Sequence, residues 1–138
     1  CQDGKRILYL ADNAGEIVLD RLLVAELPAD RVCLAVKGAP VINDATIEDA
    51  RVAGLTDMVE VIENGTAAPG TILDGCSDAF RKRFDRADVV IAKGQGNYET
   101  LSAVNKDGLF FLLKAKCPVI ARDIGCDIGD IVVKAANA

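Results

Sequence analysis

Short, wholly apolar runs recur along this chain and alternate with segments of helical periodicity. The runs at 6–11, 31–36 and 88–92 place apolar side chains at consecutive positions, and a helical segment follows each of them. A strand that is apolar on both faces is buried on both, which is typical of a parallel sheet covered by helices on each side. The pattern therefore predicts an α/β fold, an open Rossmann-like three-layer α/β/α sandwich with a mostly parallel sheet, formed by residues 1–138 as a single domain.

The order of the elements follows from hydrophobic periodicity and from the turn residues between the segments. Strands are expected at 6–11, 31–36, 58–62, 88–92 and 118–122, with a sixth at 130–133, and helices at 16–26, 46–53, 74–86 and 98–104. The helix at 46–53 has a Thr-x-x-Asp start, typical of a capping box, and Gly54 as its stop. The apolar segment 109–114 fits a helix or a strand, and periodicity does not decide between them.

Charge and composition exclude several classes of function. The 138 residues carry 16 Lys and Arg against 21 Asp and Glu, a net charge of −5 with no histidine. An acidic chain without a basic cluster argues against nucleic acid or an anionic membrane as its partner. Apolar residues make up 51%, too many for a disordered chain, and the apolar stretches are far shorter than a membrane span.

The absence of histidine also limits the chemistry. It rules out a Ser-His-Asp triad, a Cys-His pair and an imidazole zinc site, so a general acid or base has to be Asp, Glu, Lys, Tyr or Cys. Five cysteines, of which Cys1 is the first, stand at irregular spacings that fit neither a disulfide framework nor a CxxC motif. We therefore expect free thiols in a reducing cytoplasm.

Polar side chains follow nearly every predicted strand, at the point where the strand ends. In open α/β sheets ligands bind beyond the carboxyl ends of the strands, so these side chains gather at one edge. The polar groups at this edge are Asp12 with Asn13, Lys37 with Asn43 and Asp44, Glu63 with Asn64, the segment 93–97 and, after the predicted strand at 118–122, Asp123. One polar strand end is ordinary loop chemistry, whereas several on one edge indicate a binding site.

Asp12, Asn13 and Asp44 are candidate ligands for a hard cation. Carboxylate and amide oxygens suit an octahedral Mg²⁺, Mn²⁺, Co²⁺ or Ni²⁺ with open water positions. The same residue types are good N-caps and turn formers, so the sequence alone leaves both interpretations open. Glu16 and Asn43 are secondary candidates because they adjoin these segments.

A second candidate site binds an anion. It consists of Lys93, Gly94, Gln95, Gly96 and Asn97. A lysine at a strand end, followed by glycine amides and a helix N-terminus, suits a phosphate group. The Gly-x-Gly lacks the third glycine of a dinucleotide fingerprint, and a flexible surface loop is the alternative interpretation. Lys37 is a secondary candidate, and Lys114 taken alone is interpreted as a solvated lysine.

Together these candidates indicate phosphoryl chemistry. A cation held by carboxylates would polarise a phosphoryl oxygen and lower the pKa of a bound water, while Lys93 would stabilise charge on the phosphoryl oxygens. A covalent phosphoaspartate on Asp12 is disfavoured, because the haloacid-dehalogenase signature Asp-x-Asp needs an aspartate where Ala14 stands.

Four segments carry motifs that can be compared with a known family, at 12–16, 36–46, 91–101 and 110–119. In this order they resemble the damage-control phosphatase family, which was long catalogued as a domain of unknown function and has a metal-binding ARMT-like domain. The resemblance is to the C-terminal α/β domain of the prokaryotic branch, because Gln95 stands where eukaryotic members often carry an aspartate.

The resemblance implies a divalent-metal phosphatase of sugar phosphates and other small, often damaged, phosphorylated metabolites. The family's metal ligands correspond to Asp12, Asn13 and Asp44, and its substrate contacts correspond to 93–97 and Lys114. Of these, Asp12 and Lys93 are the implied catalytic residues. Full family members have a helical region before this domain, and this chain is expected to lack it.

Two other functions stay open on the sequence. One is a non-catalytic module of the same fold that binds a metal or a metabolite. The other is a carboxyl methyltransferase that uses S-adenosylmethionine, although such an enzyme needs an acidic ribose-binding residue where Lys37 and Gly38 stand. We expect a metal-dependent phosphomonoester hydrolase with a small phosphorylated metabolite as its substrate.

Overall fold

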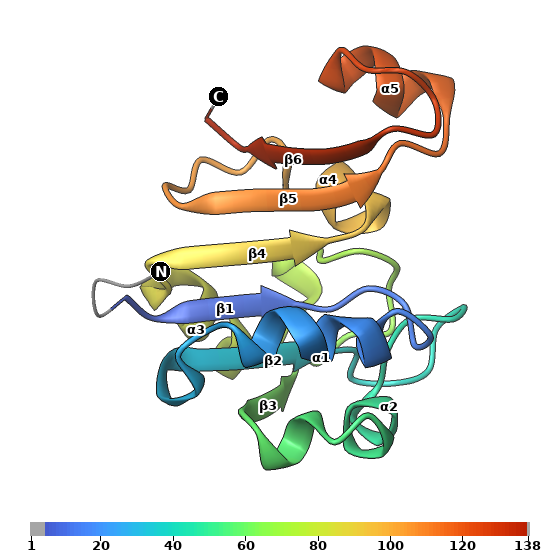
Figure 1. Ribbon diagram of the computed structural model, residues 1–138. Coiled ribbons are helices and arrows are strands. Elements are labelled where there is room, and N and C mark those ends of the chain that lie inside the picture. Colours follow the sequence, from blue (N-terminus) through green and yellow to red (C-terminus); the bar gives the residue numbers. More distant parts are fainter. Residues whose placement is uncertain (1–4, 138) are drawn as a thin grey trace.

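The computed structural model describes residues 5–137, so Cys1 lies outside the described residues, and it contains a six-stranded sheet of order β3-β2-β1-β4-β5-β6 (Figure 1). The strands are β1 (Ile7–Leu10), β2 (Val32–Val36), β3 (Glu60–Glu63), β4 (Val89–Lys93), β5 (Leu109–Lys114) and β6 (Ile131–Ala135). β1 to β5 are parallel, and β6 is antiparallel to β5. The predicted α/β fold with a mostly parallel sheet is confirmed.

Helices cover both faces of this sheet. They are α1 (Ile17–Ala25), α2 (Ile47–Val52), α3 (Asp78–Arg86), α4 (Gln95–Leu101) and α5 (Pro118–Ile124), with short 3-10 helices η1 (Ala29–Arg31), η2 (Leu55–Asp57) and η3 (Leu73–Gly75). Residues of α1 and α2 pack into one core, and residues of α3, α4 and α5 pack into the other. The result is the predicted three-layer arrangement, with α1 in front of the sheet in Figure 1.

The alternation of side chains along each buried strand supplies both cores. In β1, Ile7 and Tyr9 belong to the core under α1, whereas Leu8 and Leu10 belong to the core under α3. All four residues of β1 are buried, as expected of a central strand in a parallel sheet. The hydrophobic burial that stabilises the fold is therefore shared between two layers that meet at β1, β2 and β4.

The ends of α2 follow the local signals in the sequence. Asp49 Oδ2 accepts hydrogen bonds from the backbone N–H of Thr46 at 2.8 Å and from Thr46 Oγ1 at 2.7 Å. Gly54, just after the helix, has a φ of 74°, in the left-handed region that glycine adopts without strain. The predicted capping box and glycine stop are confirmed.

The prediction of a strand at 118–122 was wrong. These residues form α5, which Pro118 begins, and proline is well suited to the first turn because it has no N–H to leave unpaired. The ambiguous segment 109–114 is instead the fifth parallel strand, with buried and exposed residues alternating along it. Asp123 therefore lies on a helix rather than at a strand end, and its Oδ2 accepts a hydrogen bond from Tyr98 Oη at 2.6 Å.

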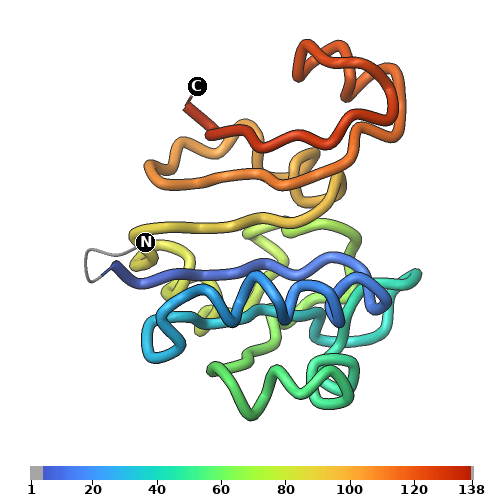
Figure 2. Tube along the Cα trace, in the orientation of Figure 1, coloured from blue at the N-terminus to red at the C-terminus, as the bar shows by residue number. Residues whose placement is uncertain are grey.

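The parallel strands all end at the same edge of the sheet. In Figure 2, drawn in the orientation of Figure 1, the loops that follow β1, β2 and β4 lie on the right of the molecule, beyond the carboxyl ends of the strands. This carboxyl edge is the place that the sequence predicted for the site. Within the described residues, no helix is long and apolar enough to cross a membrane.

Candidate functional site

Backbone pairing joins the two segments that hold the predicted metal ligands. The Asp12 carbonyl accepts a hydrogen bond from Ala45 N at 2.8 Å, and Ala14 N donates to the Asn43 carbonyl at 2.9 Å. Between these bonds, Asn13 and Asp44 form an isolated antiparallel bridge. The loop after β1 and the loop before α2 therefore run side by side, and they bring Asp12, Asn13 and Asp44 together as predicted.

The Asp12 carboxyl group lies in an electrostatically unfavourable position. Burial, followed by repulsion from Asp44 and Glu16, raises the pKa of Asp12 to about 6, although Lys116 and Lys93 oppose the shift. Two carboxylates are thus held near one another against their mutual repulsion. A cation between them would relieve that repulsion.

The metal-ligand set is mixed in its chemistry. Among residues 5–137, no three Asp, Glu or Cys side chains gather in a group that would hold a metal ion. Asn13 Oδ1 accepts a hydrogen bond from Gly15 N at 2.7 Å, and an amide oxygen has a second lone pair. The predicted set of two carboxylates and one amide therefore offers oxygen donors only, which suits a hard cation.

Gly94 brings the end of β4 against Asp12. A Cβ atom on Gly94 would lie 2.0 Å from Asp12 Oδ2, and the residue has a φ of 82°. Both the space and the left-handed backbone require glycine here. The predicted anion segment and the predicted metal ligands are therefore in direct contact.

Lys93, the last residue of β4, is buried between the carboxylates of Glu16, just before α1, and Asp20, in α1. Its Nζ lies 2.6 Å from Asp20 Oδ1, and it also forms an ion pair with Glu16. Burial alone would lower the pKa of Lys93, but the hydrogen bonds to Asp20 and Glu16 outweigh burial and raise it. Tyr9 Oη donates a hydrogen bond of 2.7 Å to the same Asp20 oxygen.

Asp20 and Tyr9 were not among the residues predicted from the sequence. Asp20 is 4% exposed, and its Oδ2 has no hydrogen-bond partner among the described residues. The signal was available, because Asp20 follows Glu16 by four residues inside an otherwise apolar helical stretch. Residues at this spacing lie on the same side of a helix, so the two acids can meet one lysine.

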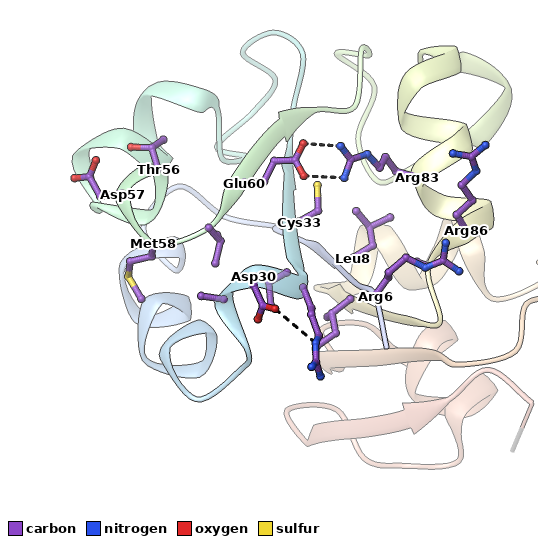
Figure 3. A pocket seen from close by; sticks show the side chains of 16 residues that line it. Arg6, Leu8, Asp30, Cys33, Thr56, Asp57, Met58, Glu60, Arg83 and Arg86 are labelled. Atoms are coloured by element: carbon purple, nitrogen blue, oxygen red, sulfur yellow. Dashed lines mark hydrogen bonds and ion pairs between the residues drawn. The ribbon is translucent and has the colours of Figure 1, made fainter. Parts of the chain in front are cut away.

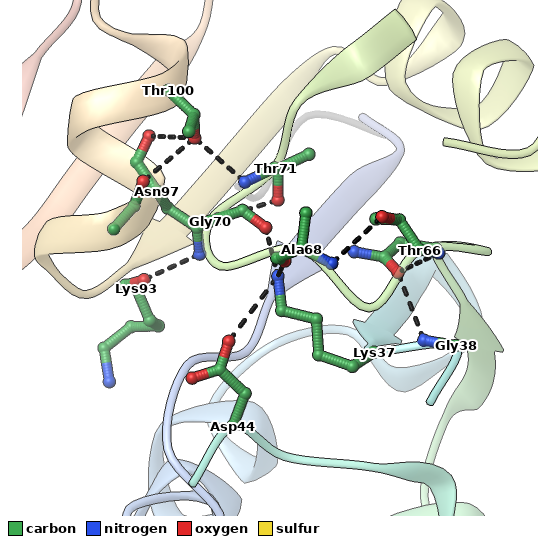
Figure 4. A network of polar contacts seen from close by, with 12 residues as sticks. Lys37, Gly38, Asp44, Thr66, Ala68, Gly70, Thr71, Lys93, Asn97 and Thr100 are labelled. Atoms are coloured by element: carbon green, nitrogen blue, oxygen red, sulfur yellow. Dashed lines mark hydrogen bonds and ion pairs between the residues drawn. The ribbon is translucent and has the colours of Figure 1, made fainter. Parts of the chain in front are cut away.

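Lys37, at the end of β2, is the second buried lysine of this edge (Figure 4). Its Nζ donates hydrogen bonds to the carbonyls of Ala68, at 2.9 Å, and Gly70, and it lies 3.6 Å from Asp44 Oδ2. Burial lowers the pKa of Lys37 in spite of the nearby Asp44 carboxylate. Lys37 thus ties the loop after β3 to a predicted metal ligand.

The side chains of the predicted anion segment are engaged within the protein. Asn97 Nδ2 donates to the Lys93 carbonyl at 2.7 Å, and Asn97 Oδ1 accepts from Thr71 Oγ1 at 2.7 Å. Gln95 Oε1 accepts from Lys116 N at 2.9 Å. These contacts fix the first turn of α4 against its neighbours, with Gly94 directly before the helix and Gly96 within that turn.

Two predicted site residues, Lys114 and Asn43, lie at the surface, outside the buried charge network of Lys37 and Lys93. The side chain of Lys114, at the end of β5, is exposed. Asn43 is also exposed, and the contact described for it is the backbone bond to Ala14. Both belong to the carboxyl edge, but neither is built into the buried charge network.

A large cavity lies at the opposite edge of the sheet (Figure 3). It has a volume of about 710 Å³ and is lined by Arg6, Arg31, Cys33, Glu60, Arg83 and Arg86 among others. Arg83 pairs with Glu60 through two bonds of 2.6 and 2.7 Å, and Arg6 pairs with Asp88. None of the predicted site residues lines this cavity, and most of its charge is neutralised by neighbouring acids.

Comparison with known proteins agrees with the resemblance seen in the motifs. Residues 1–132 match the model of the "Damage-control phosphatase ARMT1-like domain". This chain belongs to the damage-control phosphatase ARMT1-like family. The family match covers the whole sheet except the end of β6.

Members of the ARMT1-like family in archaea are close relatives. A damage-control phosphatase of Pyrococcus horikoshii is 47% identical over 132 residues, and one of Archaeoglobus fulgidus is 46% identical over 132 residues. An uncharacterised protein of Methanocaldococcus jannaschii is 47% identical over 135 residues. Each match covers 94% of this chain but only 44 to 46% of the relative, so the chain spans less than half the length of these curated relatives.

A solved structure confirms the ARMT1-like fold. The crystal structure of a DUF89 family protein from Pyrococcus horikoshii superposes with a TM-score of 0.87 at 46% sequence identity. The match covers 93% of this chain and 46% of that chain.

Proposed function

We propose that this chain is the α/β domain of a metal-dependent phosphatase that hydrolyses sugar phosphates or other small phosphorylated metabolites, damaged ones included. The observation that carries the proposal is the backbone pairing that places Asp12, Asn13 and Asp44 side by side at the carboxyl edge. The names of the two phosphatase relatives support the same reaction class.

The residues at this edge fit a divalent cation. Asp12 and Asp44 would hold it together with Asn13, because buried carboxylates that repel one another gain most from a shared positive charge. Mg²⁺, Mn²⁺, Co²⁺ and Ni²⁺ all accept such oxygen ligands. When bound, the cation supplies Lewis-acid polarisation of a phosphoryl oxygen.

Lys93 supplies the positive charge for the phosphoryl group. An ammonium has three N–H donors, and in the free protein Asp20 and Glu16 accept from it; a phosphoryl oxygen is an acceptor of the same kind. Gly94 lets the end of β4 approach Asp12 closely because it carries no side chain, and this keeps Lys93 beside the predicted cation ligands. Lys114, exposed on the neighbouring β5, is a second cation for the substrate.

Composition supports a proposal for the substrate class and for the cellular compartment. A net charge of −5 without a basic cluster favours a small metabolite over nucleic acid. Cys33, Cys76, Cys117 and Cys126 are free thiols, which supports a reducing cytoplasm as its place of work.

The test is phosphate release from a panel of sugar phosphates, in EDTA and with each of the four cations. We expect turnover that requires a cation and that Asp12→Ala abolishes. Asp85→Ala, which removes an exposed carboxylate on α3, is the matched control and should keep wild-type activity.

Thermal melting separates binding from catalysis. A cation that binds only the folded state raises the Tm of the wild type by mass action, and Asp12→Ala should lose that rise. Turnover that survives in Asp12→Ala would contradict the assignment. A Tm rise without turnover on any phosphate ester would instead favour a binding module.

A further inference from the structure

The two carboxylates on Lys93 differ in their accessibility. The side chain of Asp20 is 4% exposed, whereas that of Glu16 is 37% exposed. Glu16 directly precedes α1 and Asp20 lies in its first turn, four residues later, and both bond the same Nζ atom. Lys93 therefore has one buried carboxylate partner, Asp20, and one partly exposed partner, Glu16.

Asp20 is held in place from two sides. Its Oδ1 accepts from Tyr9 Oη at 2.7 Å and from Lys93 Nζ at 2.6 Å, and all three side chains are buried. Withdrawing Lys93 would leave a buried carboxylate without its counter-charge, which costs several kcal/mol. Asp20 is therefore a permanent partner of the lysine.

Glu16 has no comparable anchor. It precedes α1 and makes no side-chain capping bond there, and more than a third of its side chain is in solvent. Because Glu16 lies partly in solvent, its carboxylate regains hydration when it leaves Lys93, and another anion on Lys93 keeps the buried ammonium paired.

We propose that Glu16 occupies the position of the substrate's phosphoryl group on Lys93, and that Asp20 with Tyr9 forms the positioning pair that keeps the ammonium in place during the exchange. The inference deepens the proposed function and rests on it. In the free protein Asp20 accepts from one N–H of the buried ammonium and Glu16 from another, and an arriving phosphoryl oxygen takes the place of Glu16, which moves toward solvent.

The two carboxylates should then have opposite effects on anion binding. Glu16 competes with phosphate for Lys93 and repels it, so neutralising Glu16 strengthens binding. Asp20 orients the ammonium, so neutralising Asp20 weakens binding. A purely structural role for both acids would move the two variants in the same direction.

The experiment measures the Kd of inorganic phosphate by calorimetry, with saturating Mg²⁺ and in EDTA. We expect Glu16→Gln to lower the Kd about tenfold and Asp20→Asn to raise it about tenfold, each equal to about 1.4 kcal/mol. Glu26→Gln, an exposed glutamate just after α1, is the matched control and should leave the Kd unchanged.

Tyr9→Phe covers the case in which Asp20→Asn does not fold. It removes only the hydroxyl that orients Asp20, and it should raise the phosphate Kd by a smaller factor, about threefold. In the phosphatase assay, Glu16→Gln should lower KM, whereas Tyr9→Phe should lower kcat more than it changes KM.

The outcomes keep the two proposals apart. Phosphate binding that is tighter in Glu16→Gln, together with no turnover on any ester, supports the exchange and overturns the phosphatase. Turnover in the wild type with equal or weaker phosphate binding in Glu16→Gln overturns the exchange and leaves the phosphatase standing. Absence of phosphate binding in both wild type and Glu16→Gln also overturns the exchange.

Discussion

Charged side chains are buried at the carboxyl edge of the sheet and exposed at the amino edge. At the carboxyl edge the side chains of Lys37 and Lys93 are 6% and 11% exposed, and both bond buried or half-buried partners. At the amino edge Arg6 and Arg83 are 64% and 49% exposed, and each pairs with an acid in solvent. Buried charge is costly to the fold, whereas exposed pairs are almost free.

This difference in charge burial favours the carboxyl edge as the candidate site, whereas cavity volume would favour the amino edge. The large cavity lies at the amino edge, where the charged side chains are exposed. The buried charges lie at the carboxyl edge, where parallel sheets bind ligands. Burial of the Lys93–Asp20 pair destabilises the fold relative to exposed charges, so we infer that the pair serves the proposed site. Three substitutions test that contrast.

The largest effect is expected from Lys93→Ala. Removing the ammonium leaves Asp20 charged and buried, so the free energy of unfolding should fall by about 3–5 kcal/mol. Phosphatase activity should fall by about 10²-fold or more, because one positive charge on the phosphoryl group is lost. Urea denaturation and a turnover assay measure the two effects separately.

The double variant Lys93→Ala with Asp20→Asn is the control for this prediction. It removes the stranded carboxylate, so it should recover part of the lost stability without recovering activity. A loss of stability below about 1 kcal/mol in the single variant would mean that this pair behaves like those at the amino edge, and the contrast would break.

Much of this contrast could be predicted from the sequence. Apolar runs fixed the positions of β1, β2 and β4, and the polar residues after them identified the edge that holds Asp12 and Asp44. The segment 118–122 was wrongly predicted as a strand because a short apolar run fits either a strand or a buried helix. Pro118, which is well suited to the first turn of a helix, was the residue that favoured the helix.

The partners of Lys93 could not be predicted in the same way. The spacing of Glu16 and Asp20 indicates two acids on one side of a helix, but it does not indicate which lysine they meet. Strand order and helix placement bring Lys93 to Asp20 across 73 positions of the chain, and they bring Tyr9 to the same carboxylate. The sequence therefore predicts which residues are candidates for the chemistry, whereas the sheet topology decides which of them neutralise one another.

A smaller effect is expected from pH through Asp12. Its pKa is raised from 3.8 to about 6 in the folded protein, so the folded state holds this proton more tightly than the unfolded state does. Asp12 therefore stabilises the metal-free protein most below pH 4, and that contribution is lost as the pH rises through 6. Asp12→Asn lacks this dependence.

Chemical denaturation in EDTA at pH 5 and pH 7 gives the comparison. The stability of the wild type relative to Asp12→Asn should be higher at pH 5 than at pH 7, and the variant should be the more stable protein at pH 7. Other titrating groups cancel in the difference. A pH-independent difference would mean that Asp12 is as well solvated as the acids of the amino edge.

The smallest effect is expected from Arg83→Gln at the amino edge. The variant breaks both hydrogen bonds to Glu60, but the two side chains are each 49% exposed, so water replaces the lost partner. The free energy of unfolding should change by less than about 1 kcal/mol, and the difference should shrink further in high salt. Turnover should equal that of the wild type, because no residue of the carboxyl edge contacts this pair. A loss of several kcal/mol, or of activity, would show that charge at the amino edge is as important to this protein as the buried network around Lys93.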